Sequence, residues 1–174
     1  MFSFIRRALV GALTPALVLG LVACAPAVPF TVAQDATNPL CADVIVRLKS
    51  VPVIDNHARR ETDAQATAAW GNPAAILLRC GVPVPGPSTL QCATVGGVDW
   101  LRDDADAPNY VFTTYGRDPA VEVIVNGNEA SGTQALTSLS NAVGSIPATR
   151  ACTNPDDVLN LPELTPTPSP SPSP

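Results

Sequence analysis

Apolar residues recur at helical spacing in two segments of the chain. In the first, Asn38-Pro39 has the pattern of a helix start, and the apolar run that follows ends at Pro52. In the second, Ser131 is placed to cap a helix that ends before Pro147. The apolar stripe of this second helix consists of Leu136, Leu139, Val143 and Ile146. We therefore expect one helix at each end of the folded region.

Between these helices, four segments have the β-branched, aromatic or alternating pattern of strands. They are residues 74–80, 93–101, 110–115 and 120–125. Gly96-Gly97 interrupts the second segment, and the turn from Gly116 to Pro119 joins the last two into a hairpin. Residues 55–69 are polar without a strong period and predict a loop. The pattern predicts an α+β fold, in which a small antiparallel sheet of about four strands is packed with an N-terminal and a C-terminal helix.

The first residues have the pattern of an export signal. Two arginines precede an uncharged apolar run from Ala8 to Leu21. The residues Leu21-Val22-Ala23-Cys24 then match the lipobox of bacterial lipoproteins position by position. This resemblance implies cleavage before Cys24 and attachment of acyl chains such as palmitate to it, and two or three chains make a stable anchor. The alternative is an uncleaved transmembrane helix, but Pro15, Pro26 and Pro29 interrupt the run.

The lipobox and the composition of the two ends define the expected boundaries. Residues 1–23 are interpreted as a lipoprotein signal peptide and residues 24–37 as a tether. Residues 38–157 are predicted to form a single α+β domain. Residues 158–174 are predicted to be a disordered tail, because their Thr/Ser-Pro alternation favours an extended chain. We expect the mature protein on the extracytoplasmic face of the cell membrane, held by its lipid.

Four cysteines remain after Cys24. Outside the cytoplasm an even set predicts disulfides, and four cysteines allow three pairings. We favour Cys80–Cys92, which would close a proline-rich loop, and Cys41–Cys152, which would join the two ends of the folded region. The spacing lacks the close cysteine pair of a redox enzyme and the histidines of a zinc site, so no cofactor or metal is expected.

The charge of the chain limits its partners. The formal net charge is -5, and removal of Arg6 and Arg7 with the signal peptide leaves 8 basic residues against 15 acidic ones, a net charge of -7. An acidic protein without a basic stripe is not expected to bind nucleic acid. The same composition argues against a surface that recruits itself to anionic lipid by charge, so a covalent or apolar anchor is needed if a membrane holds the protein.

Several short motifs resemble a family of small actinobacterial lipoproteins that is classed as domain of unknown function 3515. The motifs are Ala69-Trp70-Gly71-Asn72-Pro73, Cys80-Gly81-Val82, Cys92, Gly97-Val98-Asp99-Trp100 and Thr114-Tyr115-Gly116-Arg117-Asp118-Pro119. With the lipobox, Cys41 and Cys152, they cover most of the mature chain. The resemblance supports the compartment and a single domain, and it implies no activity, substrate or catalytic residue.

Three groups of side chains are candidates for a site. His57, the only histidine, has Asp55 nearby but no nucleophile motif, so a surface histidine is favoured. The aspartates between Asp99 and Asp106 lack the glycine and glutamate of a calcium loop and are interpreted as a solvated loop. The third group combines aromatic residues with arginines, which can bind a sugar or an anion, although core packing is the favoured role of its tryptophans. Its possible binding residues are Trp70, Arg79, Asp99, Trp100, Tyr115 and Arg117, with Tyr110 as a further aromatic.

No catalytic constellation is visible in the sequence. The preferred hypothesis is therefore a non-enzymatic, lipid-anchored module that binds an envelope protein or a cell-wall component. The alternative is an envelope enzyme that acts on cell-wall or lipid precursors through Asp99 or His57.

Overall fold

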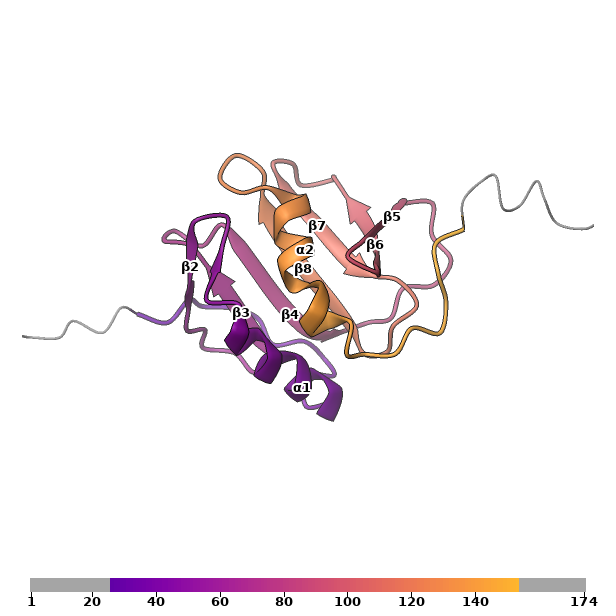
Figure 1. The fold of residues 1–174 in the computed structure, drawn as a ribbon, viewed down its shortest axis with the longest axis horizontal. Helices are drawn as coiled ribbons and strands as arrows, with labels where there is room; N and C mark the ends of the chain where they lie inside the picture. Colours follow the sequence, from indigo (N-terminus) through magenta and orange to yellow (C-terminus); the bar gives the residue numbers. More distant parts are fainter. Residues whose placement is uncertain (1–25, 154–174) are drawn as a thin grey trace, which may run out of the picture.

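Eight antiparallel strands form one sheet, and two short helices lie on one of its faces (Figure 1). The computed structural model describes residues 26–153. In chain order the elements are α1 (Pro39–Arg47), a 3-10 turn η1 (Leu48–Ser50), β1 (Val53–Ile54), β2 (His57–Arg60), β3 (Thr67–Trp70), β4 (Ile76–Val82), β5 (Gln91–Val95), β6 (Val98–Asp103), β7 (Asn109–Thr114), β8 (Ala120–Asn126) and α2 (Gly132–Val143). The strand order in the sheet is β1-β2-β3-β4-β8-β7-β6-β5.

The sheet consists of two four-stranded meanders that meet at its centre. Strands β1 to β4, with α1, form the N-terminal half (residues 26–82), and β5 to β8, with α2, form the C-terminal half (residues 83–153). The halves pair through β4 and β8, where Leu78 lies opposite Val123. After β4, residues 83–90 carry the chain to the far edge of the sheet, where β5 begins. The two edge strands are therefore β1 and β5.

The two central strands alternate between a buried and a half-buried face. Ile76, Leu78 and Cys80 of β4, with Val121 and Val123 of β8, are fully buried beneath the helices. The residues between them are half-buried on the opposite face. This period of two places one apolar row of each strand in the core.

Both helices begin at the residues that the sequence predicted. The side chain of Asn38 accepts a hydrogen bond from the amide of Leu40 at 3.0 Å. Ser131 Oγ accepts one from the amide of Gln134 at 3.4 Å. The stripe predicted for the second helix is buried, although its last member, Ile146, lies beyond the helix end.

The predicted α+β fold with about four strands is wrong, because the sheet has eight strands and the protein is mostly β. Residues 55–69, expected to be a loop, contain β2 and most of β3. Gly96 and Gly97, with φ of 58° and 78°, form the turn of a hairpin between β5 and β6 instead of interrupting one strand. Such positive φ values suit glycine and match the twist of a two-residue hairpin turn.

All four cysteines form disulfides, as expected, but the favoured pairing is wrong. The bonds are Cys41–Cys80 and Cys92–Cys152. Cys80 lies on a central strand and Cys92 on an edge strand, with three strands between them. Strands are about 4.8 Å apart, which separates these two cysteines by roughly 19 Å, far beyond disulfide reach. Each half of the protein therefore has its own disulfide.

Residues 26–37 pack along the sheet on the face opposite the helices. The Val28 amide donates to the Glu61 carbonyl at 2.8 Å. The Phe30 ring lies 5.7 Å from the guanidinium carbon of Arg79, and the Asp35 amide donates to the Gly81 carbonyl at 2.9 Å. A side chain at Gly81, where φ is 95°, would overlap the backbone at Asp35.

None of the helices in residues 26–153 has the length and apolar content needed to cross a bilayer. The predicted signal peptide, Cys24 and the tail from residue 158 lie outside the described residues.

Candidate binding site

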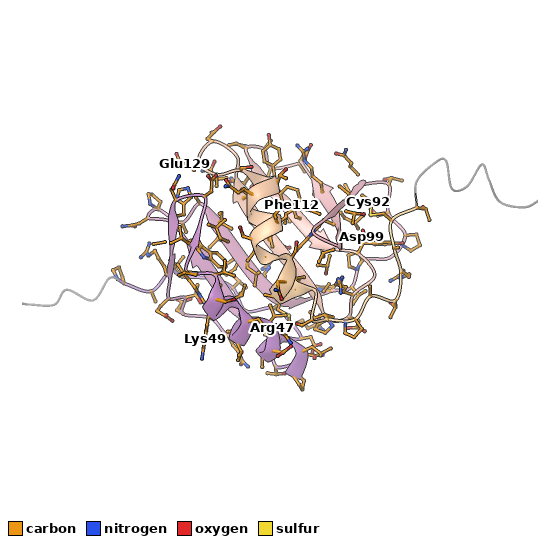
Figure 2. All side chains as sticks on the ribbon, in the orientation of Figure 1. Arg47, Lys49, Cys92, Asp99, Phe112 and Glu129 are labelled. Carbon is orange, nitrogen blue, oxygen red and sulfur yellow. A yellow bond between two sulfur atoms is a disulfide. The ribbon has the colours of Figure 1, made fainter. Side chains whose placement is uncertain are left out.

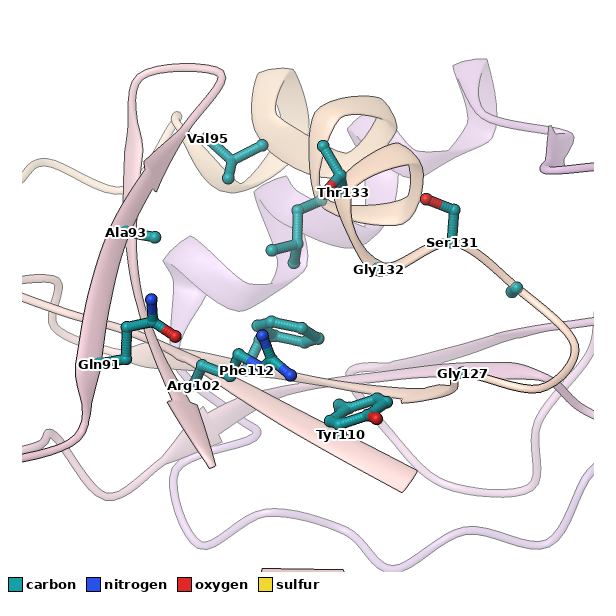
Figure 3. Close-up of a pocket in the computed structure, with 12 residues that line it drawn as sticks. Gln91, Ala93, Val95, Arg102, Tyr110, Phe112, Gly127, Ser131, Gly132 and Thr133 are labelled. Carbon is teal, nitrogen blue, oxygen red and sulfur yellow. The ribbon is translucent and has the colours of Figure 1, made fainter. Parts of the chain in front are cut away.

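A groove of about 390 Å³ opens between the start of α2 and the β5–β7 region of the sheet (Figure 3). Phe112 and Tyr110 of β7 lie at its base. Ala93 and Val95 of β5 form one wall, and Gly132 and Thr133 at the start of α2 form the other. Leu136 also lines the groove. Since most of these side chains are apolar, the groove suits an apolar group.

Two glycines allow the aromatic rings to lie against the backbone at the start of α2. A β-carbon on Gly127 would come within 2.5 Å of Tyr110 Cε2. One on Gly132 would lie 3.1 Å from Phe112 Cζ. The rings therefore occupy the space that a β-carbon at Gly127 or Gly132 would need. This close packing fixes the position of the rings at the base of the groove.

One cation lies at the groove. The guanidinium carbon of Arg102 is 4.8 Å from the centre of the Tyr110 ring, and Arg102 Nε donates to Asp104 Oδ1 at 2.7 Å. Both side chains of this ion pair are at least 40% exposed, so the pair adds little to stability. The exposed guanidinium can therefore exchange partners with an acidic group at modest cost.

Beside the groove, β5 has an unpaired edge. In the described chain β5 pairs with β6 alone, and it contains no proline and no charged residue. The Tyr115 amide donates to the Asp99 carbonyl at 2.8 Å, so the backbone of Asp99 faces β7. Thr94 lies opposite Asp99 in the β5–β6 register, and its own N–H and C=O therefore point to the outer edge.

The opposite edge of the sheet is much shorter. Strand β1 has two residues and follows Pro52 directly. Short strands and prolines are the usual means of preventing another chain from pairing with an edge. Of the two edges, only β5 has the length and composition to accept a further strand.

The aromatic candidates from the sequence have different locations. Trp70 and Trp100 are fully buried in the core on the helix side. Trp70 Nε1 donates to the Val51 carbonyl at 3.1 Å, whereas Trp100 Nε1 has no acceptor among the described residues. Tyr115 is half-buried, and the Arg150 guanidinium lies 5.3 Å from its ring.

Arg117 is buried and connects three segments. Its Nη1 donates to the Ile146 carbonyl beyond α2, and its Nη2 donates to the Gly97 carbonyl at 3.3 Å. Burial lowers the pKa of the Arg117 guanidinium, and the charge of Asp99 opposes this by raising it. Asp99 itself accepts hydrogen bonds from the Thr94 hydroxyl at 2.6 Å and from the backbone amide of Cys152 at 2.8 Å.

Arg79 lies on the face opposite the helices, away from the tryptophans. Its Nε donates to Glu122 Oε1 at 2.7 Å. The six possible binding residues are thus distributed over the core and the opposite face, and they do not line the groove.

The remaining candidates are bound within the domain. His57 Nε2 lies 3.0 Å from the Glu129 carbonyl. The loop aspartates bind locally, as when Asp103 Oδ1 accepts from the Ala105 amide at 2.9 Å. Across residues 26–153, no three histidine, cysteine, aspartate or glutamate side chains gather as a metal-binding group.

The sequence interpretation considered Tyr110 but missed the other groove residues. Gly96-Gly97 was the available signal, because a two-glycine turn places residues 91–95 on a separate edge strand. The proximity of Arg102 and Phe112 to the start of α2 depends on how the helix crosses the sheet, for which the sequence contains no local signal.

Comparison with known proteins supports the predicted family. The family model described as "Protein of unknown function (DUF3515)" matches residues 8–151. No curated protein and no solved structure matches the chain.

Proposed function

The chain belongs to the DUF3515 family of proteins of unknown function, and from this premise we propose that it is a lipid-anchored, extracytoplasmic binding module. Its ligand is an extended polypeptide segment of an envelope protein, which pairs with β5 as a ninth strand. The module is not an enzyme.

The anchor and the compartment are supported by the sequence and the cysteines. The lipobox at Leu21–Cys24 follows a signal-like apolar run. The four cysteines beyond it are paired in two disulfides, which persist in oxidising compartments outside the cytoplasm.

The unpaired edge of β5 is the observation on which the ligand class rests. A row of free N–H and C=O groups binds an extended chain by main-chain hydrogen bonds, and side-chain pockets beside it give selectivity. Gln91, Ala93 and Val95 alternate along β5 toward the groove. A paired segment would place every second side chain over the same groove. An apolar side chain fits the aromatic base, and an acidic one can bind Arg102.

The enzymatic alternative has less support. His57 on β2 and Asp99 on β6 are separated by five strand spacings, roughly 24 Å. Each already binds backbone of its own surroundings. Two such residues cannot act on one substrate atom together.

The proposed ligand class is tested by replacing Ala93, which is exposed and faces the groove, with a photo-crosslinking amino acid. The control position is Gln34, exposed on the N-terminal segment. In intact cells we expect an adduct with a discrete envelope protein from position 93 and none from position 34. The crosslinked segment is then synthesised and titrated into the purified protein. Amide exchange at Cys92 and Thr94 is expected to slow when it binds.

A matched pair of variants separates strand addition from other binding. Thr94→Pro removes the N–H that points to the outer edge, and it breaks no hydrogen bond between β5 and β6. Edge strands tolerate proline at such positions. Thr94→Val keeps that N–H and loses only the hydroxyl that binds Asp99. We expect Thr94→Pro to weaken peptide binding by about tenfold, the equivalent of one hydrogen bond, and Thr94→Val to leave it nearly unchanged. Equal affinities for Thr94→Pro and the unmodified protein would contradict the proposal.

The anchor is tested separately through Cys24. Cys24→Ala is expected to release the protein from the membrane fraction or to stall its processing. Full membrane retention at unchanged mass would exclude a lipid at this residue.

A further inference from the structure

The chain leaves the described domain directly beside β5. Cys152 is bonded to Cys92 of β5, and the Cα atoms of the two residues are 5.8 Å apart. The Cys152 amide also donates to Asp99 Oδ2 at 2.8 Å, which holds this part of the chain against β6. Figure 2 shows Cys92 and Asp99 at the end of the molecule where the described residues finish, one residue after Cys152. The residues that follow are therefore tethered next to the unpaired edge.

Residues 157–161 have the composition of a ligand for this edge. They lie between two prolines and contain none, so each of the five residues has an amide N–H, and β5 also has five residues. The period of two along a strand puts Asp157, Leu159 and Leu161 on one face. This row combines one acidic and two apolar side chains, the kinds that the groove beside β5 suits. The Thr/Ser-Pro alternation begins only at Thr165, beyond the segment.

The connection from the disulfide to this segment is long enough to reach the outer side of β5. Asp157 follows Cys152 by five residues, which span up to about 17 Å when extended. A ninth strand beside Gln91 lies 5.8 Å to Cys92, one residue along β5 and one strand spacing away, a path of about 14 Å. The tether therefore delivers Asp157 beside the first residue of β5. From there the segment runs in the same direction as β5 and ends beside Val95.

The charge in the groove favours the same direction. Gln91 lies opposite Arg102 in the β5–β6 register, whereas the last residue of β5 lies opposite a valine. In the parallel arrangement Asp157 is therefore at the end of β5 that has the cation. Arg102 donates to Asp104 through Nε, and its Nη1 and Nη2 form no hydrogen bond within residues 26–153. The guanidinium thus has donors for a second carboxylate.

We propose that residues 157–161 bind β5 of the same molecule as a parallel ninth strand, with Leu159 and Leu161 over the groove and Asp157 toward Arg102. The segment occupies the site until a peptide of another protein displaces it. This inference concerns the site of the proposed function and rests on β5 as the strand-binding edge. An external ligand is then expected to have the same pattern, an acidic residue with apolar residues two and four positions after it.

The tether makes weak contacts sufficient. A short connection keeps a segment at an effective concentration on the order of 1 mM beside its site. With an intrinsic Kd of about 0.1 mM, the segment would occupy β5 about nine-tenths of the time and raise the apparent Kd of an external peptide about tenfold. The segment therefore selects against ligands that bind only weakly.

The test uses the photo-crosslinking amino acid at Ala93 in the purified protein, with position Gln34 as the control. After irradiation the disulfides are reduced and the protein is digested with trypsin, which places position 93 on the peptide 80–102 and the segment on the peptide 151–174. We expect position 93 to join these two peptides within one chain, with attachment inside residues 157–161, and position 34 not to do so. Absence of this adduct, attachment only outside the segment, or an adduct between two chains would overturn the proposal.

A matched pair of variants separates docking in the groove from simple proximity to the disulfide. Leu159→Asp puts a charge on the row over the groove, and Val158→Asp puts the same charge on the opposite row. We expect Leu159→Asp to lower the adduct yield at least fivefold and Val158→Asp to change it by less than twofold. Equal yields from the two variants would overturn the placement of Leu159 over the groove.

A synthetic peptide of residues 154–164 then measures how far the segment blocks the site. Titrated into the protein, it is expected to bind the Leu159→Asp variant about tenfold more tightly than the unmodified protein, because only the unmodified segment competes with it. Equal affinities would show that β5 is not occupied by the segment.

Failure of this inference and failure of the proposed function are distinguishable. If the protein has no external ligand, the adduct in the purified protein persists while intact cells give no partner adduct from position 93. If the segment does not bind β5, the adduct is missing from the purified protein, whatever is captured in cells.

Discussion

Replacing each disulfide-bonded pair by serine tests how much each bond stabilises the protein. The Cys41–Cys80 bond closes 39 residues and the Cys92–Cys152 bond closes 60. In the chain-entropy model these loops contribute about 3.9 and 4.3 kcal/mol, so loop length alone ranks the second bond slightly higher. The loops neither overlap nor enclose one another, and their effects should therefore be nearly additive.

Burial reverses this order. Cys41 and Cys80 are both fully buried in the core, whereas Cys92 and Cys152 are half-buried at the surface. Serine hydroxyls left without a hydrogen-bond partner in the core add about 1–3 kcal/mol of desolvation cost. We expect the Cys92→Ser/Cys152→Ser variant to lose about 4 kcal/mol of unfolding free energy and the Cys41→Ser/Cys80→Ser variant about 5–7 kcal/mol.

The assay is urea denaturation followed by the fluorescence of the two buried tryptophans. Alanine at positions 41 and 80 is the control, because it removes the bond without adding hydroxyls. The alanine variant should lose less unfolding free energy than the serine variant. If the surface pair proves at least as costly as the core pair, the reasoning from burial is refuted.

Peptide mapping tests the pairing itself. Trypsin cuts after Arg79 and Arg102, so Cys80 and Cys92 leave on one peptide. With the observed pairing, this peptide remains joined to both the peptide ending at Arg47 and the one beginning at Ala151 in an unreduced digest. The pairing favoured from the sequence would instead leave it as a separate peptide with an internal bond. A further cut at Leu90 distinguishes the third possible pairing.

Three further predictions follow from side-chain surroundings. Trp70→Phe should cost about 1 kcal/mol more than Trp100→Phe in urea denaturation, because only Trp70 donates a hydrogen bond, and equal costs would contradict this account. Gly116→Ala should destabilise by several kcal/mol more than Gly97→Ala, since φ is positive at both but only a β-carbon at Gly116 would overlap other backbone; similar melting temperatures would refute it. The salt-bridging arginine of α1 lowers the pKa of Asp43, so this carboxylate stabilises the protein above its unfolded pKa and the small effect is lost as pH falls through the folded value. An ordinary or raised pKa for Asp43 in an NMR titration would show that the pair does not form in solution.

The accuracy of the sequence interpretation depended on how local each signal was. The caps at Asn38 and Ser131 and the stripe from Leu136 to Ile146 depend on neighbours within a few turns, and they were located correctly. The hairpin of β7 and β8 was also found, because a short turn joins its strands.

Strands β2 and β3 were missed for a physical reason. His57–Arg60 is a polar strand near an edge, where no apolar row is required. Thr67–Trp70 is buried on both faces, because the helix side and residues 26–37 cover it, so its residues do not alternate. A strand shows alternating apolar and polar residues only when one of its faces is buried and the other is exposed to solvent. Neither β2 nor β3 has this combination.

The candidate site shows the same limit. Arginine and aromatic residues were sought together, and the structure does bring Arg102 to Tyr110. The residues chosen, however, included Trp70 and Trp100, whose depth in the core depends on the strand order. Composition indicates which side chains can bind a ligand, but the exposed fraction of each depends on what packs over it.

The sequence by itself determined the two helices, the central hairpin, the participation of four cysteines in disulfides and the family. These features depend on short-range spacing or on the kinds of residue present. Only the tertiary structure decided the number and order of the strands, the disulfide pairing and the groove beside β5. The reason is that a strand has no stable partner within its own segment: its neighbours are selected by packing between residues far apart in the chain, and that packing also selects which cysteines meet and which edge stays open.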